Sequence, residues 1–94
     1  MTWLDCCIDV SHWSNCGEEI DWVAVDPAIL LVFAKATQGG NYVDPSFAKN
    51  KDGALASGRM FVPYHFMDGS DRDDQIDNFW PHLDKGKPFA LDWE

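Results

Sequence analysis

The last residues of the sequence are Phe89-Ala90-Leu91-Asp92-Trp93-Glu94, a short apolar run that ends in two acids. Side chains of a β-strand alternate between the two faces of a sheet, so Asp92 and Glu94 point to one face and Trp93 to the other. Two carboxylates side by side on one surface repel each other, and the repulsion raises the pKa of at least one of them. Pairs of acids with such shifted pKa values are typical of functional sites. This strand end is a candidate active site, with a solvated strand end as the simpler alternative.

Three apolar runs upstream resemble this closing stretch. They occupy residues 4–10, 29–36 and 60–66, and each is interrupted by only a few polar positions. Runs of this length predict strands of a parallel sheet that is covered on both faces. Residues 89–94 complete the series as the last predicted strand.

The segments between these runs predict helices. Residues 20–25 suggest a short helix or turn that Pro27 closes. Asp44 as N-cap and Pro45 at the first helical position predict a second helix, which Gly58 ends. Its expected apolar side consists of Phe47, Ala48, Leu55 and Ala56.

A third helix is expected between the last two strands. Ser70 is its predicted N-cap, and Pro81 ends or kinks it. The apolar positions follow the i, i+3, i+4, i+7 spacing of one helix face, and they are Ile76, Phe79, Trp80 and Leu83. Strands that alternate with helices in this way predict an α/β fold with right-handed crossovers.

Polar side chains collect at the carboxyl ends of the predicted strands, where parallel sheets place their functional residues. They are Asp9, Lys35, Tyr64, His65, Asp92 and Glu94. Carboxylates beside aromatic rings suit acid-catalysed cleavage of a glycosidic bond, in which one acid donates a proton and another stays ionised. Trp13 and Trp93 are candidates for stacking on sugar rings, although aromatic residues at such positions also serve as core.

A metal site is the rival interpretation of the same strand ends. Its candidate ligands are His12, His65, Asp9 and Asp92. The sequence has no His-x-His or His-x-x-x-His spacing to support it, and no cofactor is expected. The acidic run 68–77 lacks the closing glutamate of a calcium-binding loop and is interpreted as favourable charge at a helix N-terminus.

The composition indicates one globular unit over residues 1–94, with 46% apolar side chains and a net charge of −9. The negative charge disfavours nucleic acid and anionic membranes as partners. No apolar run approaches the roughly 20 residues of a membrane span, and residues 1–10 lack the pattern of a signal peptide, so action outside a cell needs another route of release. Cys6, Cys7 and Cys16 are interpreted mainly as small buried hydrophobic residues.

Seven short blocks of the sequence occur in an order shared with a known family. The blocks are IDVSHW (8–13), IDW (20–22), FAKAT (33–37), YVDPSF (42–47), YHF (64–66), Gln75 with Phe79, and ALDWE (90–94). Together they resemble glycoside hydrolase family 25, the N-acetylmuramidase lysozymes of bacteria and phages, over nearly all of the chain.

The resemblance implies hydrolysis of the β-1,4 bond between N-acetylmuramic acid and N-acetylglucosamine in the peptidoglycan of a cell wall. It implies that Glu94 is the general acid and that Asp92 orients the substrate's acetamido group for a neighbouring-group mechanism. By the same resemblance Asp9 joins the acidic cluster, Tyr64 lines the sugar site and Lys35 supports the barrel mouth.

Gln38 departs from the family pattern, because an acid usually follows the Lys-Ala-Thr motif at that position. The departure alters a polar contact in the groove rather than the proposed acids. Gln38 and Trp13 are therefore included with Tyr64 and Lys35 as expected substrate contacts.

The resemblance also implies a TIM-like (β/α) barrel, of which this sequence holds the first four strands and the helices between them. A complete barrel needs about 200 residues or more. We therefore expect the N-terminal half of a catalytic domain, with one open strand edge. An inactive half-barrel that binds glycan, or that associates with itself through this edge, is the alternative.

Overall fold

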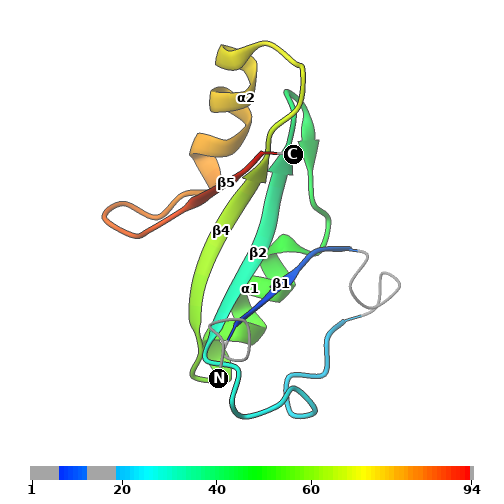
Figure 1. The fold of residues 1–94 in the computed structure, drawn as a ribbon, viewed down its shortest axis with the longest axis vertical. Helices are drawn as coiled ribbons and strands as arrows, with labels where there is room; N and C mark the ends of the chain where they lie inside the picture. Colours follow the sequence, from blue (N-terminus) through cyan, green and yellow to red (C-terminus); the bar gives the residue numbers. More distant parts are fainter. Residues whose placement is uncertain (1–6, 13–18, 94) are drawn as a thin grey trace.

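The computed structural model describes residues 7–12 and 19–93, and its centre is a parallel β-sheet (Figure 1). Four strands lie in the order β1-β2-β4-β5, with every neighbouring pair parallel: β1 (Cys7–Val10), β2 (Leu31–Gln38), β4 (Met60–Phe66) and β5 (Ala90–Asp92). A short strand, β3 (Tyr42–Val43), folds back antiparallel onto the end of β2. The predicted α/β fold with a parallel sheet is confirmed.

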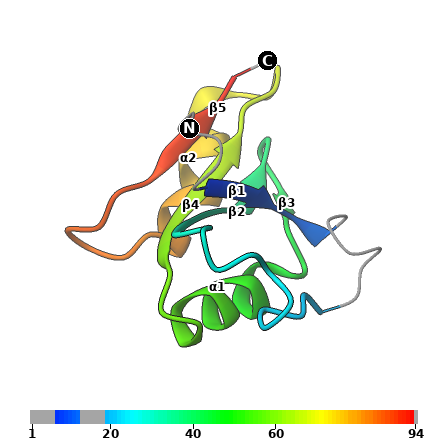
Figure 2. The same cartoon turned by 60° about the horizontal axis from the view of Figure 1, so that its bottom comes forward.

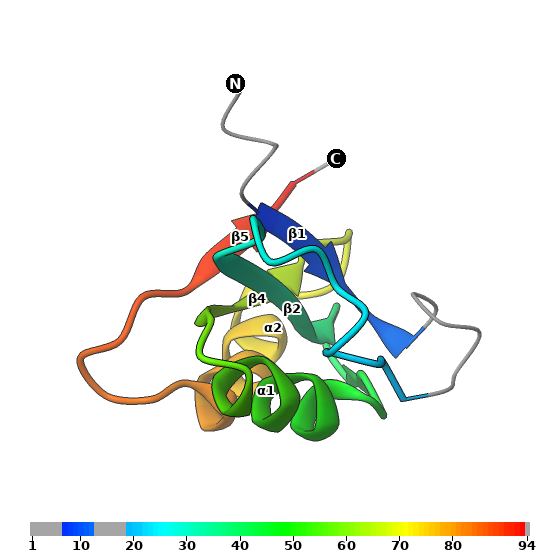
Figure 3. The same cartoon turned by 90° about the horizontal axis from the view of Figure 1, so that it is seen from below.

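Two helices, α1 (Phe47–Ala56) and α2 (Arg72–Phe79), connect β2 to β4 and β4 to β5. Figure 3 shows both helices on the same side of the sheet, and Figure 2 shows α1 below the strands in an intermediate view. A 3-10 turn, η3 (Trp80–His82), follows α2. It contains Pro81, so the predicted end of the helix at this proline is confirmed.

The core lies between the two helices and the face of the sheet that they cover. From Val32 to Ala36 every second side chain of β2 is buried on this helix-covered face, as expected for a strand with one covered side. The buried cluster consists of Val10, Val32, Ala34, Ala36, Phe47, Ala54 and Phe79, with Ile8, Ile20, Trp22, Phe61 and Leu83 packed against it.

The opposite face of the sheet is here called the site face. Figure 3 shows no helix over this face within the described residues. The side chains of Phe33, Lys35 and Tyr64 are only half-buried there. The prediction of a sheet covered on both faces is wrong for this part of the chain. The reason is topological: successive right-handed crossovers that advance in one direction place their helices on one side.

Both helices begin slightly later than predicted. The N-cap of α1 is Ser46, and the Asp44 carboxylate instead accepts a hydrogen bond from the Ser46 amide at 2.8 Å, which closes the turn before the helix. The N-cap of α2 is Asp71 rather than Ser70. In each case the predicted cap lies in the turn that precedes the helix.

The inward side of α1 differs from the predicted one. Its buried residues are Phe47, Asn50 and Ala54. The prediction is wrong beyond Phe47, because the other predicted core residues, Ala48, Leu55 and Ala56, are exposed. Gly53 provides the space for Trp22, since a Cβ atom at Gly53 would lie 2.0 Å from the indole Nε1.

The inward side of α2 is also partly mispredicted. Phe79 is buried as expected, and Leu83 packs at the edge of the core. Ile76 and Trp80 are exposed, whereas the polar side chain of Gln75 is buried. A polar residue takes the inward position because it bonds to the sheet and to the preceding loop, as described below.

Residues 20–30 are an irregular segment with turns at 22–24 and 27–28. A turn was one of the two predicted forms for residues 20–25, whereas the strand predicted at residues 29–36 begins only at Leu31. The carboxylates of Asp21 and Asp26 each accept a hydrogen bond from the amide two residues on, at 3.1 and 2.9 Å. The Arg59 guanidinium then fastens the segment, because it donates to the Ile29 carbonyl at 2.8 Å and to two further carbonyls of the loop at 3.2 Å.

Cys7 is half-buried, while Cys6 and Cys16 lie outside the described residues. Among the helices that the structure describes, none is long and apolar enough to cross a membrane.

Candidate active site

Register across the parallel strands brings five predicted site residues to one face. Residues that pair across neighbouring strands share a face of the sheet. The pairs are Asp9 with Phe33, Lys35 with Tyr64, Gln38 with Phe66, Tyr64 with Ala90, and Phe66 with Asp92. Asp9, Lys35, Gln38, Tyr64 and Asp92 therefore all lie on the site face, toward the carboxyl ends of four strands.

Lys35 is the centre of a cluster of polar and aromatic groups on this face. Its ammonium group donates a hydrogen bond to Oε1 of Gln38. The same nitrogen lies 5.3 Å from the ring centroid of Tyr42 and 5.2 Å from that of Phe66, both within the range of a cation–π interaction. Two rings and one amide thus fix the position of a positive charge beside β4, the strand that separates β2 from β5 and Asp92.

Tyr42, on β3, contributes a phenol to this cluster. Burial raises the pKa of Tyr42 above its ordinary value, and the nearby Asp44 carboxylate raises it further. Asp44 is itself buried and accepts hydrogen bonds from the amides of His12 at 2.9 Å and Ser46 at 2.8 Å. The Tyr42 hydroxyl therefore stays protonated over the neutral pH range and can act as a donor.

The predicted acids lie at different depths. Asp9 is exposed on β1, whereas Asp92 is half-buried at the end of β5, where its carbonyl accepts a hydrogen bond from the Met67 amide at 2.9 Å. Glu94 and Trp13 lie outside the described residues. The placement of Asp92 and Glu94 side by side on the site face stays a prediction.

His65 lies near the carboxyl end of β4, as predicted, but it does not belong to the site face. It alternates with Tyr64 and Phe66 along β4, so its ring points to the helix-covered face. There the residue is 2% exposed, and its ring centroid lies 5.3 Å from that of Phe79. The histidine is part of the packing behind the site.

The metal interpretation is contradicted by the same geometry. His12 lies beside the start of α1, with Nδ1 3.0 Å from Oγ of Ser46. His65 is on the face opposite Asp9 and Asp92, so the four candidate ligands do not converge. No group of three or more His, Cys, Asp or Glu side chains could hold a metal ion in residues 7–12 and 19–93.

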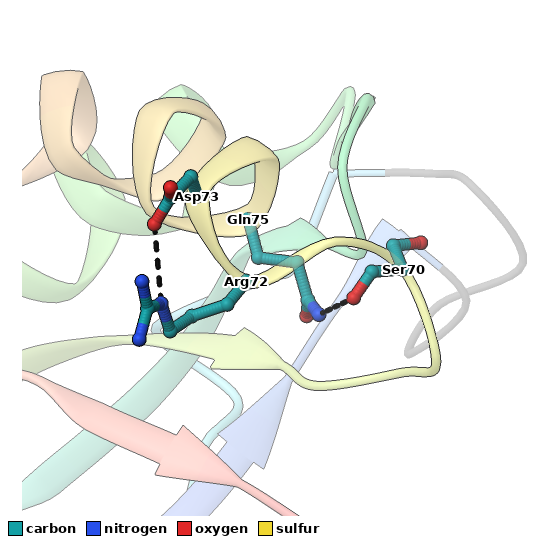
Figure 4. A network of polar contacts seen from close by, with 4 residues as sticks. All are labelled: Ser70, Arg72, Asp73 and Gln75. Carbon is teal, nitrogen blue, oxygen red and sulfur yellow. Dashed lines mark hydrogen bonds and ion pairs between the residues drawn. The ribbon is translucent and has the colours of Figure 1, made fainter.

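The loop between β4 and α2, residues 67–71, follows the carboxyl end of β4 and is held by Gln75. Figure 4 shows the Gln75 amide reaching back from the helix, with Nε2 donating to the Ser70 carbonyl at 2.8 Å. The Asp68 carboxylate accepts the Ser70 amide at 2.8 Å. Hydrogen bonds from the hydroxyl and the amide of Ser70 lower the pKa of Asp68, against a smaller opposing effect of desolvation.

Tyr42 and Phe66 are site-face residues whose contact with Lys35 the sequence analysis missed. They meet Lys35 because β3 folds back over the end of β2. Asn78 fastens this hairpin to α2, since its Nδ2 donates to the carbonyls of Gly39 at 3.1 Å and Tyr42 at 3.0 Å. The two glycines that precede Asn41 are a hairpin signal that could have revealed the contact.

Comparison with known proteins identifies similar sequences. The family model for glycosyl hydrolases family 25 matches residues 8–94. Lysozyme M1 of Streptomyces globisporus is 34% identical over an alignment that covers 93% of this chain and 32% of that protein. The chain therefore spans about a third of the length of this curated relative.

Solved structures show the same arrangement of strands and helices. A family 25 glycosyl hydrolase from Bacillus anthracis matches with a TM-score of 0.78 and 28% identity, over 89% of this chain and 40% of that one. The bacterial lysozyme from Streptomyces coelicolor matches with a TM-score of 0.72 and 32% identity, over 89% of this chain and 42% of that one. The predicted fold class, part of a TIM-like barrel, is confirmed.

Proposed function

We propose, from the premise that this chain belongs to glycosyl hydrolase family 25, that it carries the acid-bearing wall of a peptidoglycan-cleaving site. The bond cleaved is the β-1,4 linkage between N-acetylmuramic acid and N-acetylglucosamine, and the place of action is the bacterial cell wall. The observation that carries the proposal is the alignment of Asp9, Tyr64 and Asp92 on one sheet face, where parallel sheets carry their chemistry.

Two acids are proposed to divide the chemistry. Glu94 donates a proton to the oxygen of the leaving sugar. Asp92 orients the substrate's acetamido group so that its carbonyl oxygen attacks the anomeric carbon as the glycosidic bond breaks. Water then opens the cyclic intermediate and returns a proton to Glu94. Asp9 adds negative charge that stabilises the oxocarbenium-like transition state.

The remaining residues of the site face are proposed to bind the sugar rings. Tyr64 is half-buried beside Lys35 and Ala90, so part of its ring is available for contact with a sugar. The Lys35 ammonium and the Gln38 amide supply polar contacts at the rim, and Trp13 is proposed to stack on a sugar ring.

The complete groove is proposed to need further barrel strands beside β5. The support is that the aligned part makes up only 40% and 42% of the two solved relatives. Exposed apolar side chains on the helix-covered face of β5 and on α2 are consistent with such neighbours. They are Ile76, Leu91 and Trp93, which border a hollow of about 500 Å³.

The same apolar side chains favour a second candidate, in which this chain binds glycan without efficient cleavage and associates with a second copy of itself. Leu91 is 55% exposed and Trp93 is 75% exposed. Light scattering after gel filtration tests this candidate. A dimer that Leu91→Ser converts to monomer supports it, and a monomer at all concentrations contradicts it.

Digestion of purified peptidoglycan tests the catalytic proposal. In a protein that carries the complete groove we expect new reducing ends of N-acetylmuramic acid, and a rate that falls at least about 100-fold in Glu94→Gln because general acid catalysis is lost. Glu19→Gln is the matched control, since Glu19 is an exposed acid outside the site face. Reducing ends of N-acetylglucosamine contradict the assigned bond, and an unchanged rate in Glu94→Gln contradicts the assigned acid. Binding to the wall without release of fragments favours the second candidate.

A further inference from the structure

An irregularity in β2 decides which of its side chains reach the site face. Val32, Ala34 and Ala36 alternate onto the helix-covered face, so a regular strand would place Thr37 on the site face and Gln38 behind it. Between Lys35 and Thr37 the pairing with β4 slips by one residue.

The slip is a β-bulge, and it inverts the alternation for the rest of the strand. Thr37 now pairs with His65, and both residues are buried on the helix-covered face. Gln38 pairs with Phe66 and lies on the site face. Only for this reason can the Gln38 amide reach the ammonium group of Lys35, three residues earlier in the same strand.

The side chain of His65 connects the bulge to α2. Its Nδ1 lies 2.7 Å from Oγ1 of Thr37, and its Nε2 lies 2.9 Å from Oε1 of Gln75. The Gln75 Nε2 group donates to the carbonyls of Ser70 at 2.8 Å and Asp68 at 3.2 Å. The amide oxygen of Gln75 is therefore the acceptor toward the imidazole.

This network fixes the proton on Nε2 of the buried ring. Because Oε1 of Gln75 can only accept, Nε2 of His65 carries a proton. In the neutral ring Nδ1 is then an acceptor, and the Thr37 hydroxyl donates to it. Every polar atom of the two side chains that contact the imidazole is used in this arrangement.

We propose that His65, as the neutral tautomer protonated on Nε2, is a positioning residue for the Lys35 and Gln38 pair. It holds the β2 bulge through Thr37 and the loop 67–71 through Gln75, and it touches no substrate. Its contribution to glycan binding rests on the proposed function of the site face. The arrangement of Lys35 and Gln38 that it maintains does not depend on the proposed function. The positioning role and the glycan binding can therefore be tested separately.

The first test needs no substitution. Long-range ¹⁵N–¹H correlation spectra of the imidazole in the chain at neutral pH distinguish the tautomers. We expect Nε2 of His65 to be protonated and Nδ1 to be unprotonated. A ring protonated on Nδ1, or on both nitrogens, overturns the proposal.

The second test removes the hydroxyl group that holds the bulge. Thr37→Val keeps the shape of the side chain but loses the donor, whereas Thr37→Ser keeps the donor and is the matched control. We expect the NOEs between the Lys35 side chain and the Phe66 ring to be lost in Thr37→Val and kept in Thr37→Ser. If Thr37→Val folds and keeps these NOEs, the positioning role is wrong. If it does not fold, the tautomer measurement decides.

Titration with a β-1,4-linked oligomer of N-acetylglucosamine separates this inference from the function. We expect Kd to rise about tenfold in Thr37→Val, the equivalent of one hydrogen bond, and to stay unchanged in Thr37→Ser. If neither the parent chain nor either variant binds the oligomer, glycan recognition is contradicted. The NOE result still decides the positioning role in that case. Equal binding by Thr37→Val and the parent chain overturns the link between the bulge and the glycan.

Discussion

The Asp68 carboxylate lies directly over Gly39, so closely that a Cβ atom on Gly39 would be 2.2 Å from Oδ2. The glycine has a φ of 59°, and its amide donates to the Phe66 carbonyl at 3.1 Å. The turn after β2 and the loop after β4 are thus packed together at the carboxyl end of the sheet, and only glycine fits at their contact.

Gly39→Ala should destabilise the chain for two separable reasons. The left-handed backbone costs about 1–2 kcal/mol with any Cβ, and the Asp68 carboxylate must also shift to make room for the added Cβ atom. Gly58→Ala is the control, because Gly58 has a φ of 80° but a Cβ atom there would meet no other atom within 4 Å. Urea denaturation measures the free energy of unfolding of both variants. Equal losses in the two would show that the Asp68 contact is not tight.

Gly53→Ala should destabilise α1 even though alanine is the better helix former. Intrinsic propensity favours alanine by about 1 kcal/mol, but the added Cβ would meet the Trp22 indole 2.0 Å away. Overpacking of this kind costs about 1–3 kcal/mol, so we expect a lower Tm and a shifted indole N–H signal of Trp22. Ala48→Gly, at an exposed position of the same helix, measures propensity alone. A rise in Tm for Gly53→Ala contradicts the packing.

Asp68 should make the folded chain less stable in acid. Its pKa is lower in the folded chain than the ordinary value of 3.8, so the contribution to stability is present above that value and is lost as the pH falls through the folded pKa. Ser70→Ala removes the largest cause, and the pKa should rise toward 3.8. A ¹³C titration of the Asp68 carboxyl group measures this shift. Ser57→Ala, whose hydroxyl bonds to the Ala54 carbonyl, should leave it unchanged.

Asp92→Asn should reduce peptidoglycan cleavage about 100-fold or more with little change in stability, because the amide removes the negative charge that is proposed to orient the acetamido group. The initial rate of release of reducing ends is the measurement. Asp77→Asn, on the exposed side of α2, makes the same chemical change away from the site face. A wild-type rate in Asp92→Asn would remove Asp92 from the proposed mechanism.

The strands could be predicted from the sequence because their apolar runs are continuous and bounded by turn residues. Residues 60–66 were expected as a strand, and β4 has these bounds. The inward sides of the helices were harder to predict. Asn50 and Gln75 are buried polar residues, and a pattern based on apolar spacing assigns such positions to solvent.

The sheet face on which each strand-end residue lies could not be predicted from the alternation of side chains alone. Alternation separates Tyr64 from His65, but it does not say which of them faces the helices. The bulge at Ala36 could not be foreseen, because it is stabilised by Thr37 and His65, which are distant in sequence. Gln38 was therefore assigned to the groove by resemblance alone.

The position of β2 in the sheet has a consequence for the order in which the chain can fold. β2 is paired with β1, β3 and β4, so it is the common neighbour of three of the other strands. During synthesis on a ribosome its pairing with β1 can form early, but its second parallel neighbour becomes available only after Met60–Phe66 has emerged. Until then the edge of β2 that will pair with β4 has unpaired backbone groups, which can pair with strands of other chains. The nascent protein is therefore most exposed to misassembly while residues 38 to 66 are being synthesised.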